Sequence, residues 1–312
     1  MKKPFHNILK SIKTAFKKWW AKDPFKESAV IAYYAIFSLP GLLIVIVSIA
    51  GYFFGQEAVD GQITTQIAST MGLDTAQQIQ DIIAKGVQSN NSFLATVFGV
   101  ITIVVGATGV FAQFQKSINT IWEVQADESK SGIVSLLKVR LFSFGLIVAI
   151  AFILIVSLVI SASIDAFGTW ITKHFSESLL VVLQFVNFII SLSILAVLFA
   201  LMFKFFPDAE IKWRHVWIGS FVTAFLFEIG KFALGLYFAQ ADPGSGYGAA
   251  GSIILILLWV SYTSMIVFYG AEFTHAYAEM KDGKIPPDKN AVRQKNVTTD
   301  NYKTIDAHRP SV

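Results

Sequence analysis

Long stretches without charge constrain this chain more than any other feature of its sequence. Charged residues are missing from five windows, each longer than the ~20 residues that a helix needs to cross the hydrocarbon core of a bilayer. These windows are residues 28–56, 86–115, 141–164, 178–203 and 243–271. A sixth apolar stretch, residues 216–240, is interrupted only by Glu228 and Lys231. Because backbone exposed to lipid must satisfy its own hydrogen bonds, we expect each stretch to be a helix.

The sequence therefore predicts an all-α fold, a polytopic integral membrane bundle of six transmembrane helices. The predicted spans are about 29–55, 93–115, 139–164, 179–205, 214–240 and 250–275, in a membrane domain of residues 25–280. Composition agrees, since only 15% of the residues are charged, against roughly a quarter in an average soluble domain.

The positive charges are distributed unevenly about these spans. Of the 25 Lys and Arg residues, 22 lie before the first span, in the second and fourth loops, or after the last span. Only Lys85 and Lys173 lie in loops on the other side. Because positive residues are retained in the cytoplasm, we expect both termini on the cytoplasmic side.

The segments outside the spans differ in character. Residues 1–24 place apolar residues on one helical face and lysines on the other, which predicts a basic amphipathic helix in the membrane interface. A lysine-rich leader that only fixes topology is the alternative. The first outer loop, 57–85, has two helical patterns, so we expect two short helices that cap the bundle. Residues 281–312 are polar and lack periodicity, which predicts a disordered cytoplasmic tail.

Residues for catalysis or metal binding are not apparent. The chain has no cysteine, and its five histidines are scattered without the spacing of a metal site. Phosphate-binding loops and nucleophile elbows are also missing from the sequence. We therefore expect no catalytic residue, no metal and no cofactor, and we interpret the chain as a non-enzyme.

Glu228 and Lys231 are the least expected residues, because a lone charge at mid-membrane costs from ~3 to over 10 kcal/mol. Three residues apart on a helix, the two side chains are neighbours and can pair. Two interpretations remain open. The pair is either a buried ion pair that fixes helix packing, or part of a gate or binding site for a polar group.

The first span also contains unusual residues for a membrane helix. Tyr34, Ser38 and Pro40 interrupt an otherwise aliphatic run. Pro40 leaves the carbonyl of Ile36 without its helical donor. We therefore expect a kink, with Ser38 or Tyr34 near that carbonyl, and such kinks serve packing as often as function.

Four runs, in order, carry a resemblance to a known family. They are AYYAIFSLPGLL, GVFAQFQKSINTIWEV, FKFFPDAEIKWRHVWIGS and YGAAGSIILILLWVSYTSMIVFYGAEF. Together they resemble the YihY and virulence factor BrkB family of bacterial inner-membrane proteins, formerly labelled ribonuclease BN. The resemblance covers residues 25–280 and rests especially on Asn119, Trp122, Tyr247 and Glu272. It implies a multi-pass protein of the bacterial cytoplasmic (inner) membrane and adds these four residues to the candidate site.

The resemblance implies a function in the cell envelope, because family members have been linked to serum resistance and envelope lipid traffic. We hold three hypotheses: a transporter or flippase for a lipid or other amphiphile, a non-transporting membrane scaffold, and an intramembrane enzyme. Membrane lipids are the expected partners, and nucleic acid is not, because the basic residues follow membrane sidedness rather than forming a groove interleaved with aromatics. The sequence does not specify the oligomeric state.

Overall fold

The computed structural model describes residues 3–54, 60–61, 63–65, 67–68, 72–88, 109–127, 178–241 and 243–294. The predicted spans 93–115 and 139–164 lie outside these residues, except for 109–115. The chain is mostly helical. Its elements are α1 (Lys3–Ala21), α2 (Pro24–Phe54), α4 (Leu73–Gln88), β1 (Val124–Ala126), α7 (Ser178–Phe205), α8 (Trp213–Ala241), the 3-10 helix η2 (Ser245–Ala250), α9 (Gly251–Asp282) and β2 (Ala291–Arg293). Residues 109–121 form a further helix.

The helices at the predicted spans 179–205, 214–240 and 250–275 are confirmed by α7, α8 and α9. In the described part of the chain these are the three helices long and apolar enough to cross a membrane. The first predicted span lies within the continuous helix α2. The six-span topology and the side on which the termini lie stay predictions.

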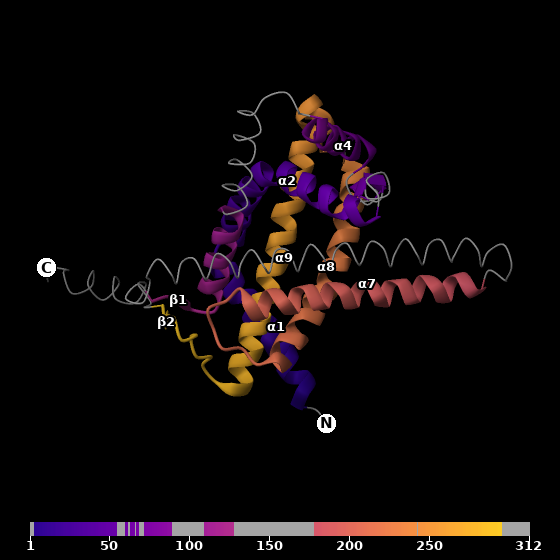
Figure 1. Cartoon of the computed structure of the whole chain (residues 1–312). Coiled ribbons are helices and arrows are strands. Elements are labelled where there is room, and N and C mark those ends of the chain that lie inside the picture. Colours follow the sequence, from indigo (N-terminus) through magenta and orange to yellow (C-terminus); the bar gives the residue numbers. More distant parts are fainter. Residues whose placement is uncertain are drawn as a thin grey trace, which may run out of the picture.

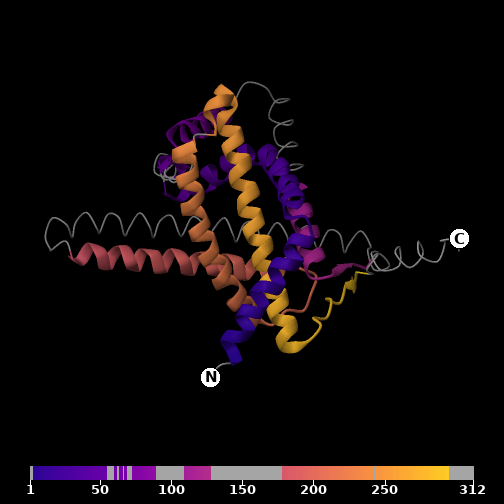
Figure 2. The ribbon, with the colours of Figure 1, turned by 180° about the vertical axis from the view of Figure 1, so that it is seen from behind.

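Helix α9 is the centre of the bundle, with α1, α2 and α8 packed along it. Helix α7 packs on α8 and runs across the bundle at a steep angle to α9 (Figures 1 and 2). The largest core cluster gathers aromatic and aliphatic side chains from 109–124, α7, α8 and α9. Fully buried Ile118, Trp122 and Phe203 belong to it.

Small residues let α8 and α9 approach closely. A Cβ atom at Gly219 would overlap the side chain of Thr274, and a Cβ atom at Gly270 would overlap that of Thr223. Each threonine hydroxyl donates to the carbonyl four residues earlier, Thr223 to Gly219 and Thr274 to Gly270, both at 2.7 Å. The two helices therefore meet through matching Gly-x-x-x-Thr faces, the kind of small-residue contact that membrane helices use.

The break between α1 and α2 falls immediately before Pro24. Pro24 opens α2, a first-turn position that tolerates its missing N–H. Asp23 before it has φ 50°, a left-handed conformation that Asp adopts more readily than most residues. The chain thus turns sharply and brings Lys22 toward α9.

Helix α1 packs against α9 rather than lying only in an interface. Ser11 and Ala15 are fully buried, and Trp19 Nε1 donates to the carbonyl of Met265 at 3.2 Å. Several of its other apolar side chains are exposed, among them Leu9 and Phe16 at 52% each. The predicted amphipathic helix exists, and contact of its exposed apolar face with lipid stays a prediction.

The prediction of disorder from residue 281 onward is wrong for residues 281–294. Helix α9 continues to Asp282, and β2 pairs antiparallel with β1. Residues 283–294, which we call the C-terminal strap, also make backbone hydrogen bonds to the connection between α7 and α8. Sequence periodicity missed the strap because an isolated three-residue strand has no pattern to detect. Residues 295–312 lie outside the described residues.

Residues of the first long loop cap the end of the bundle opposite α1. Helix α4 packs on α2 and α9, and Ser252 at the start of α9 hydrogen-bonds to Gln78. Residues 60–61, 63–65 and 67–68 are also helical. Ile63 and Ile79 share a small core with Phe238 and Ile256. Two short helical segments thus cap this end, in agreement with the sequence pattern.

Candidate functional site

A buried carboxylate on α9 lies within a network of ion pairs. Glu272 is 0% exposed. Its Oε1 lies 2.5 Å from Nζ of Lys22, which also donates to the carbonyl of Ile121 at 3.3 Å. A buried charge without a partner is very costly. The sharp turn before α2 places Lys22 beside Glu272 and so supplies that partner.

One and two turns further along α9, His275 and Glu279 extend the network. Glu279 accepts a hydrogen bond from Lys18 of α1 at 3.0 Å, and its other oxygen lies 3.5 Å from His275 Nε2. The ring of Trp122 packs on the His275 ring with centroids 4.9 Å apart. The histidine is thus held between an aromatic face and a carboxylate.

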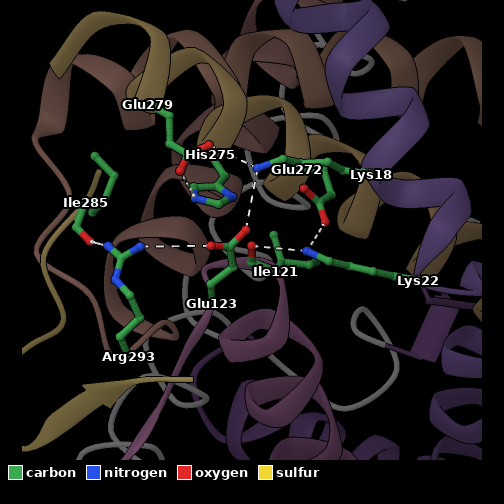
Figure 3. A network of polar contacts seen from close by, with 9 residues as sticks. All are labelled: Lys18, Lys22, Ile121, Glu123, Glu272, His275, Glu279, Ile285 and Arg293. Carbon is green, nitrogen blue, oxygen red and sulfur yellow. Dashed lines mark hydrogen bonds and ion pairs between the residues drawn. The ribbon is translucent and has the colours of Figure 1, made fainter. Parts of the chain in front are cut away.

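Glu123 connects this network to the C-terminal strap (Figure 3). Its carboxylate lies 3.6 Å from Lys18 and 3.9 Å from Arg293. Arg293 also donates to the carbonyl of Ile285 at 2.8 Å. We call the whole set the charged cluster; its members are Lys18, Lys22, Glu123, Glu272, His275, Glu279 and Arg293.

The surroundings of Lys18 stabilise its charged form. Burial lowers its pKa, but the hydrogen bond to Glu279 and the negative charges of Glu279, Glu123 and Glu272 outweigh that effect. The pKa of Lys18 is therefore raised above its ordinary value, and the side chain is positively charged at neutral pH.

Three buried polar atoms of this region have no hydrogen-bond partner among the described residues. They are Oε2 of Glu272, Nδ1 of His275 and Nε1 of Trp122. A cavity of about 40 Å³ lies beside Glu272 and is also lined by Lys22, Glu27 and Ser117. This volume is enough for a water molecule. The arrangement can therefore hold a proton or a water molecule next to the apolar core.

Glu27, at the start of α2, forms a second polar connection beside the same cavity. It accepts hydrogen bonds from Ser117 at 2.5 Å and from Gln113 at 3.2 Å. Helix 109–121 is thereby fixed to α2.

Asn119 forms a reciprocal pair with Asp208, in the connection between α7 and α8. The Asn119 amide donates to the carboxylate at 2.7 Å, and the backbone N–H of Asp208 donates back to Asn119 at 2.9 Å. Burial and the charge of Asp288 raise the pKa of Asp208, whereas hydrogen bonds from Asn119 and Gln115 lower it. The raising effects are larger, so the pKa of Asp208 lies above its ordinary value. Asn119 therefore fixes the connection rather than facing the charged cluster.

Glu228 and Lys231 do form the predicted ion pair, at 2.7 Å. The Glu228 side chain is 13% exposed and that of Lys231 is 36% exposed. Ala224, one turn before Glu228 on the same helix, is buried. Gly235 has nothing within 4 Å of a Cβ position, so among the described residues it does not admit a neighbouring helix.

The candidate residues of the first span lie away from the charged cluster. The Tyr34 ring packs against Gly109, where a Cβ atom would overlap it. Ser38 donates to the carbonyl of Ala35 at 3.2 Å rather than to that of Ile36; the alternative, Tyr34 near the Ile36 carbonyl, stays a prediction. Helix α2 continues through Pro40 and changes direction partway along its length in Figure 1. The Pro40 side chain lies outside what the structure describes.

Tyr247 is separate from all of these residues. It lies in η2 between α8 and α9 and is 60% exposed. Of the nine candidates from sequence, the described residues place Glu272 in the charged cluster and Trp122 against the ring of His275 beside it, with Glu228 and Lys231 as a second site on α8. Among the described residues, no three His, Asp or Glu side chains are grouped so that they could hold a metal ion.

Sequence reasoning missed most of the charged cluster. In the sequence, Lys18 counts only as a lysine on the polar face of the amphipathic helix and as a marker of membrane sidedness, Lys22 only as such a marker, and His275 only as one of five scattered histidines. One signal was available: Glu272, His275 and Glu279 lie at spacings of three and four, which put them on one face of a helix.

Comparisons with known proteins cover most of the chain. A family model described as virulence factor BrkB matches residues 15–295. A UPF0761 membrane protein of Saccharophagus degradans is 27% identical over 85% of this chain and 58% of its own length. One of Pseudoalteromonas atlantica is 26% identical over 78% of each chain, and one of Rhodospirillum centenum is 25% identical over 88% of this chain and 59% of its own. The chain thus spans less than two thirds of two of these relatives. No solved structure matches it.

Proposed function

This chain belongs to the virulence factor BrkB family of membrane proteins, and from that premise we propose that it is a transporter or flippase-like protein for a lipid or another amphiphile. The observation that carries the proposal is the Glu228–Lys231 ion pair within the apolar helix α8. Charged residues inside membrane segments are costly and mark pathways for substrates or ions.

The surroundings of the pair favour an amphiphile. Lys231 is more than a third exposed, so its charge is not enclosed as in a purely structural pair. Phe225, Ile229 and Phe232 on the same helix are 53%, 51% and 69% exposed. A polar headgroup at the ion pair, with its acyl chains along these apolar residues, would satisfy both kinds of surface.

We place the protein in the bacterial cytoplasmic membrane with both termini in the cytoplasm. The support is the distribution of Lys and Arg, which follows the positive-inside rule. Helix α1 pairs through Lys18 with Glu279, close to the end of α9 from which the C-terminal strap begins, so both ends of the described chain lie at one end of the bundle.

A lipid translocation assay tests the proposal. Full-length protein is reconstituted into vesicles that contain a lipid with a fluorescent acyl chain, and a membrane-impermeant reductant reports how much label reaches the outer leaflet. We expect translocation, and at least a tenfold lower rate for Glu228→Gln and Lys231→Gln. Lys281→Gln, which changes an exposed lysine at the end of α9, is the matched control.

The scaffold hypothesis predicts a different result. Vesicles with folded wild-type protein would then show no translocation above protein-free vesicles, and the protein would instead be recovered with a stoichiometric envelope partner. Equal rates for the wild type and both Gln variants would also contradict the role that we assign to the ion pair.

We also propose that the chain is not a nuclease, against the former ribonuclease label of its family. The support is the sequence, where basic residues follow membrane sidedness. Detergent-purified protein incubated with tRNA precursors and Mg²⁺ should leave them intact. Processing that disappears in Glu272→Gln would overturn this proposal.

A further inference from the structure

A large open cavity lies where two membrane helices end. Its volume is about 1100 Å³, and it is bounded by the end of α7, the start of α8 and the C-terminal strap. Helix α8 is long and apolar enough to cross a membrane, and we infer that its N-terminal end, which borders the cavity, lies at the depth of lipid headgroups. Phe111, Phe206 and Trp213 contribute apolar and aromatic wall, as is usual at this depth.

One part of the cavity wall is positively charged. Lys204 donates to the carbonyl of Ile211 at 2.6 Å, and its Nζ lies 5.9 Å from the centre of the Trp213 ring. Trp213 begins α8, whose N-terminus adds a partial positive charge. Lys284 of the strap lines the same cavity and has no ion-pair partner among the described residues. These groups can hold a phosphate.

Another part of the wall is negatively charged. Asp208 and Asp288 lie together, because the backbone N–H of Asp288 donates to the carbonyl oxygen of Asp208 at 2.9 Å. The side-chain hydrogen bonds to Asp208 come from Asn119 and Gln115, which are neutral amides. Burial and the charge of Asp288 raise the pKa of Asp208, and the hydrogen bonds from the two amides lower it; a cation placed beside the two carboxylates would balance their charges.

We propose that this cavity binds a zwitterionic headgroup, a phosphate and a primary ammonium a few bonds apart. The phosphate lies toward Lys204, Lys284 and the start of α8, and the ammonium lies toward Asp208 and Asp288. A simple anion would use only the first set of groups and would be repelled by the second. The site is distinct from the Glu228–Lys231 pair, so it stands whether or not the protein moves lipids.

Lipid binding to the full-length protein tests this assignment. Delipidated protein is placed in nanodiscs with phosphatidylethanolamine or phosphatidylglycerol as the minor lipid, and bound lipid is counted by native mass spectrometry. We expect at least fivefold more phosphatidylethanolamine, because only this lipid carries the ammonium. Asp288→Asn should abolish the preference, and Lys284→Gln should weaken binding of both lipids. Lys281→Gln, an exposed lysine outside the cavity, is the matched control.

Equal binding of the two lipids to the wild type would overturn the proposal. The same holds if Asp288→Asn and Lys284→Gln both behave like Lys281→Gln. Soluble O-phosphoethanolamine, titrated by calorimetry, separates the sources of the headgroup. If O-phosphoethanolamine binds as tightly as phosphatidylethanolamine, the natural ligand is a soluble phosphorylated amine. If only phosphatidylethanolamine binds, the natural ligand is a membrane lipid. Both results support a site for a zwitterionic headgroup.

Discussion

Lys22 and Glu272 form an ion pair of 2.5 Å although 250 residues separate them in the chain. The glutamate is fully buried, while the lysine side chain is 28% exposed. Lys22 follows α1 and Glu272 lies in α9, so the pair fixes the start of the described chain against the last helix of the bundle. The unpaired Glu272 would be the costly state, because its burial is set by α9 and not by α1.

Removing one partner of this pair should therefore destabilise the protein. We expect Lys22→Ala to lower the free energy of unfolding by about 3 kcal/mol, since it leaves a buried carboxylate unpaired. Lys26→Ala, four residues later at an exposed position, should change it by less than about 0.5 kcal/mol. Thermal unfolding in detergent measures both. A double-mutant cycle with Glu272→Gln should show coupling, and simple additivity would contradict the pairing.

The contact between α8 and α9 gives a second prediction. Gly219→Ala should destabilise the protein by about 1–3 kcal/mol, because the new methyl group overlaps Thr274 in a packed interface. Gly235→Ala lies on the same helix, where the added methyl group meets nothing within 4 Å. It should be neutral or stabilise by up to about 1 kcal/mol, as alanine favours helix. Equal unfolding temperatures for the two variants would refute the interface.

The spans were predictable because a long stretch with few charges is a local property of sequence. Uncharged windows located α7 and α9, and the apolar stretch 216–240 located α8, each to within a few residues apart from the last seven residues of α9. Those residues are polar on one face, since Glu279 pairs there with Lys18 of α1 and Asp282 pairs with Arg214 of α8. A window that counts charge ends at Glu272 and cannot detect a charge that is neutralised by a distant segment.

The candidate site was only partly predictable for the same reason. The charged cluster depends on pairings between α1, the residues after helix 109–121, and α9, and the sequence does not reveal which lysine meets which carboxylate. Sequence alone identified Glu228 and Lys231 because three-residue spacing on one helix is local. The C-terminal strap was not predicted from sequence because its ordered structure comes from the pairing of β2 with β1, not from its own composition.

Asp208 gives a prediction for pH dependence. Its folded pKa is raised above the ordinary value of 3.8, so the folded state keeps the proton to higher pH than the unfolded state. Stability from this group is therefore present below pH 3.8 and is lost as the pH rises through the folded pKa. The unfolding temperature of the wild type minus that of Asp208→Asn should fall between pH 3.8 and the folded pKa of Asp208, and should stay constant above that pKa. Asp288→Asn should narrow this pH range, since it removes a charge that raises the pKa of Asp208. A temperature difference that does not change with pH would contradict the assignment.

The predicted topology can be tested because the chain has no native cysteine. We expect a cysteine at Gln80, in α4, to react with an impermeant thiol reagent on intact cells. A cysteine at Lys289, in the C-terminal strap, should react only after the cells are opened. Both positions are exposed, so access to the reagent depends on sidedness alone. The reverse pattern would invert the orientation, and labelling of both on intact cells would exclude cytoplasmic termini.

The Glu228–Lys231 pair distinguishes a structural role from a functional one. Glu228→Ala or Lys231→Ala leaves an unpaired charge in an apolar helix, so each single variant should accumulate in the membrane at a lower level than Lys281→Ala. The double variant Glu228→Leu with Lys231→Leu removes both charges and should restore the level. If this double variant also restores lipid translocation, the pair only fixes packing. We expect the double variant to accumulate normally but not to translocate lipid, because the part-exposed lysine points to a role in holding a polar group. The exchange variant, Glu228→Lys with Lys231→Glu, keeps both charges in contact and should recover part of the translocation rate. If instead the single variants match the wild type in both accumulation and translocation, the pair lies at a hydrated position outside the mechanism.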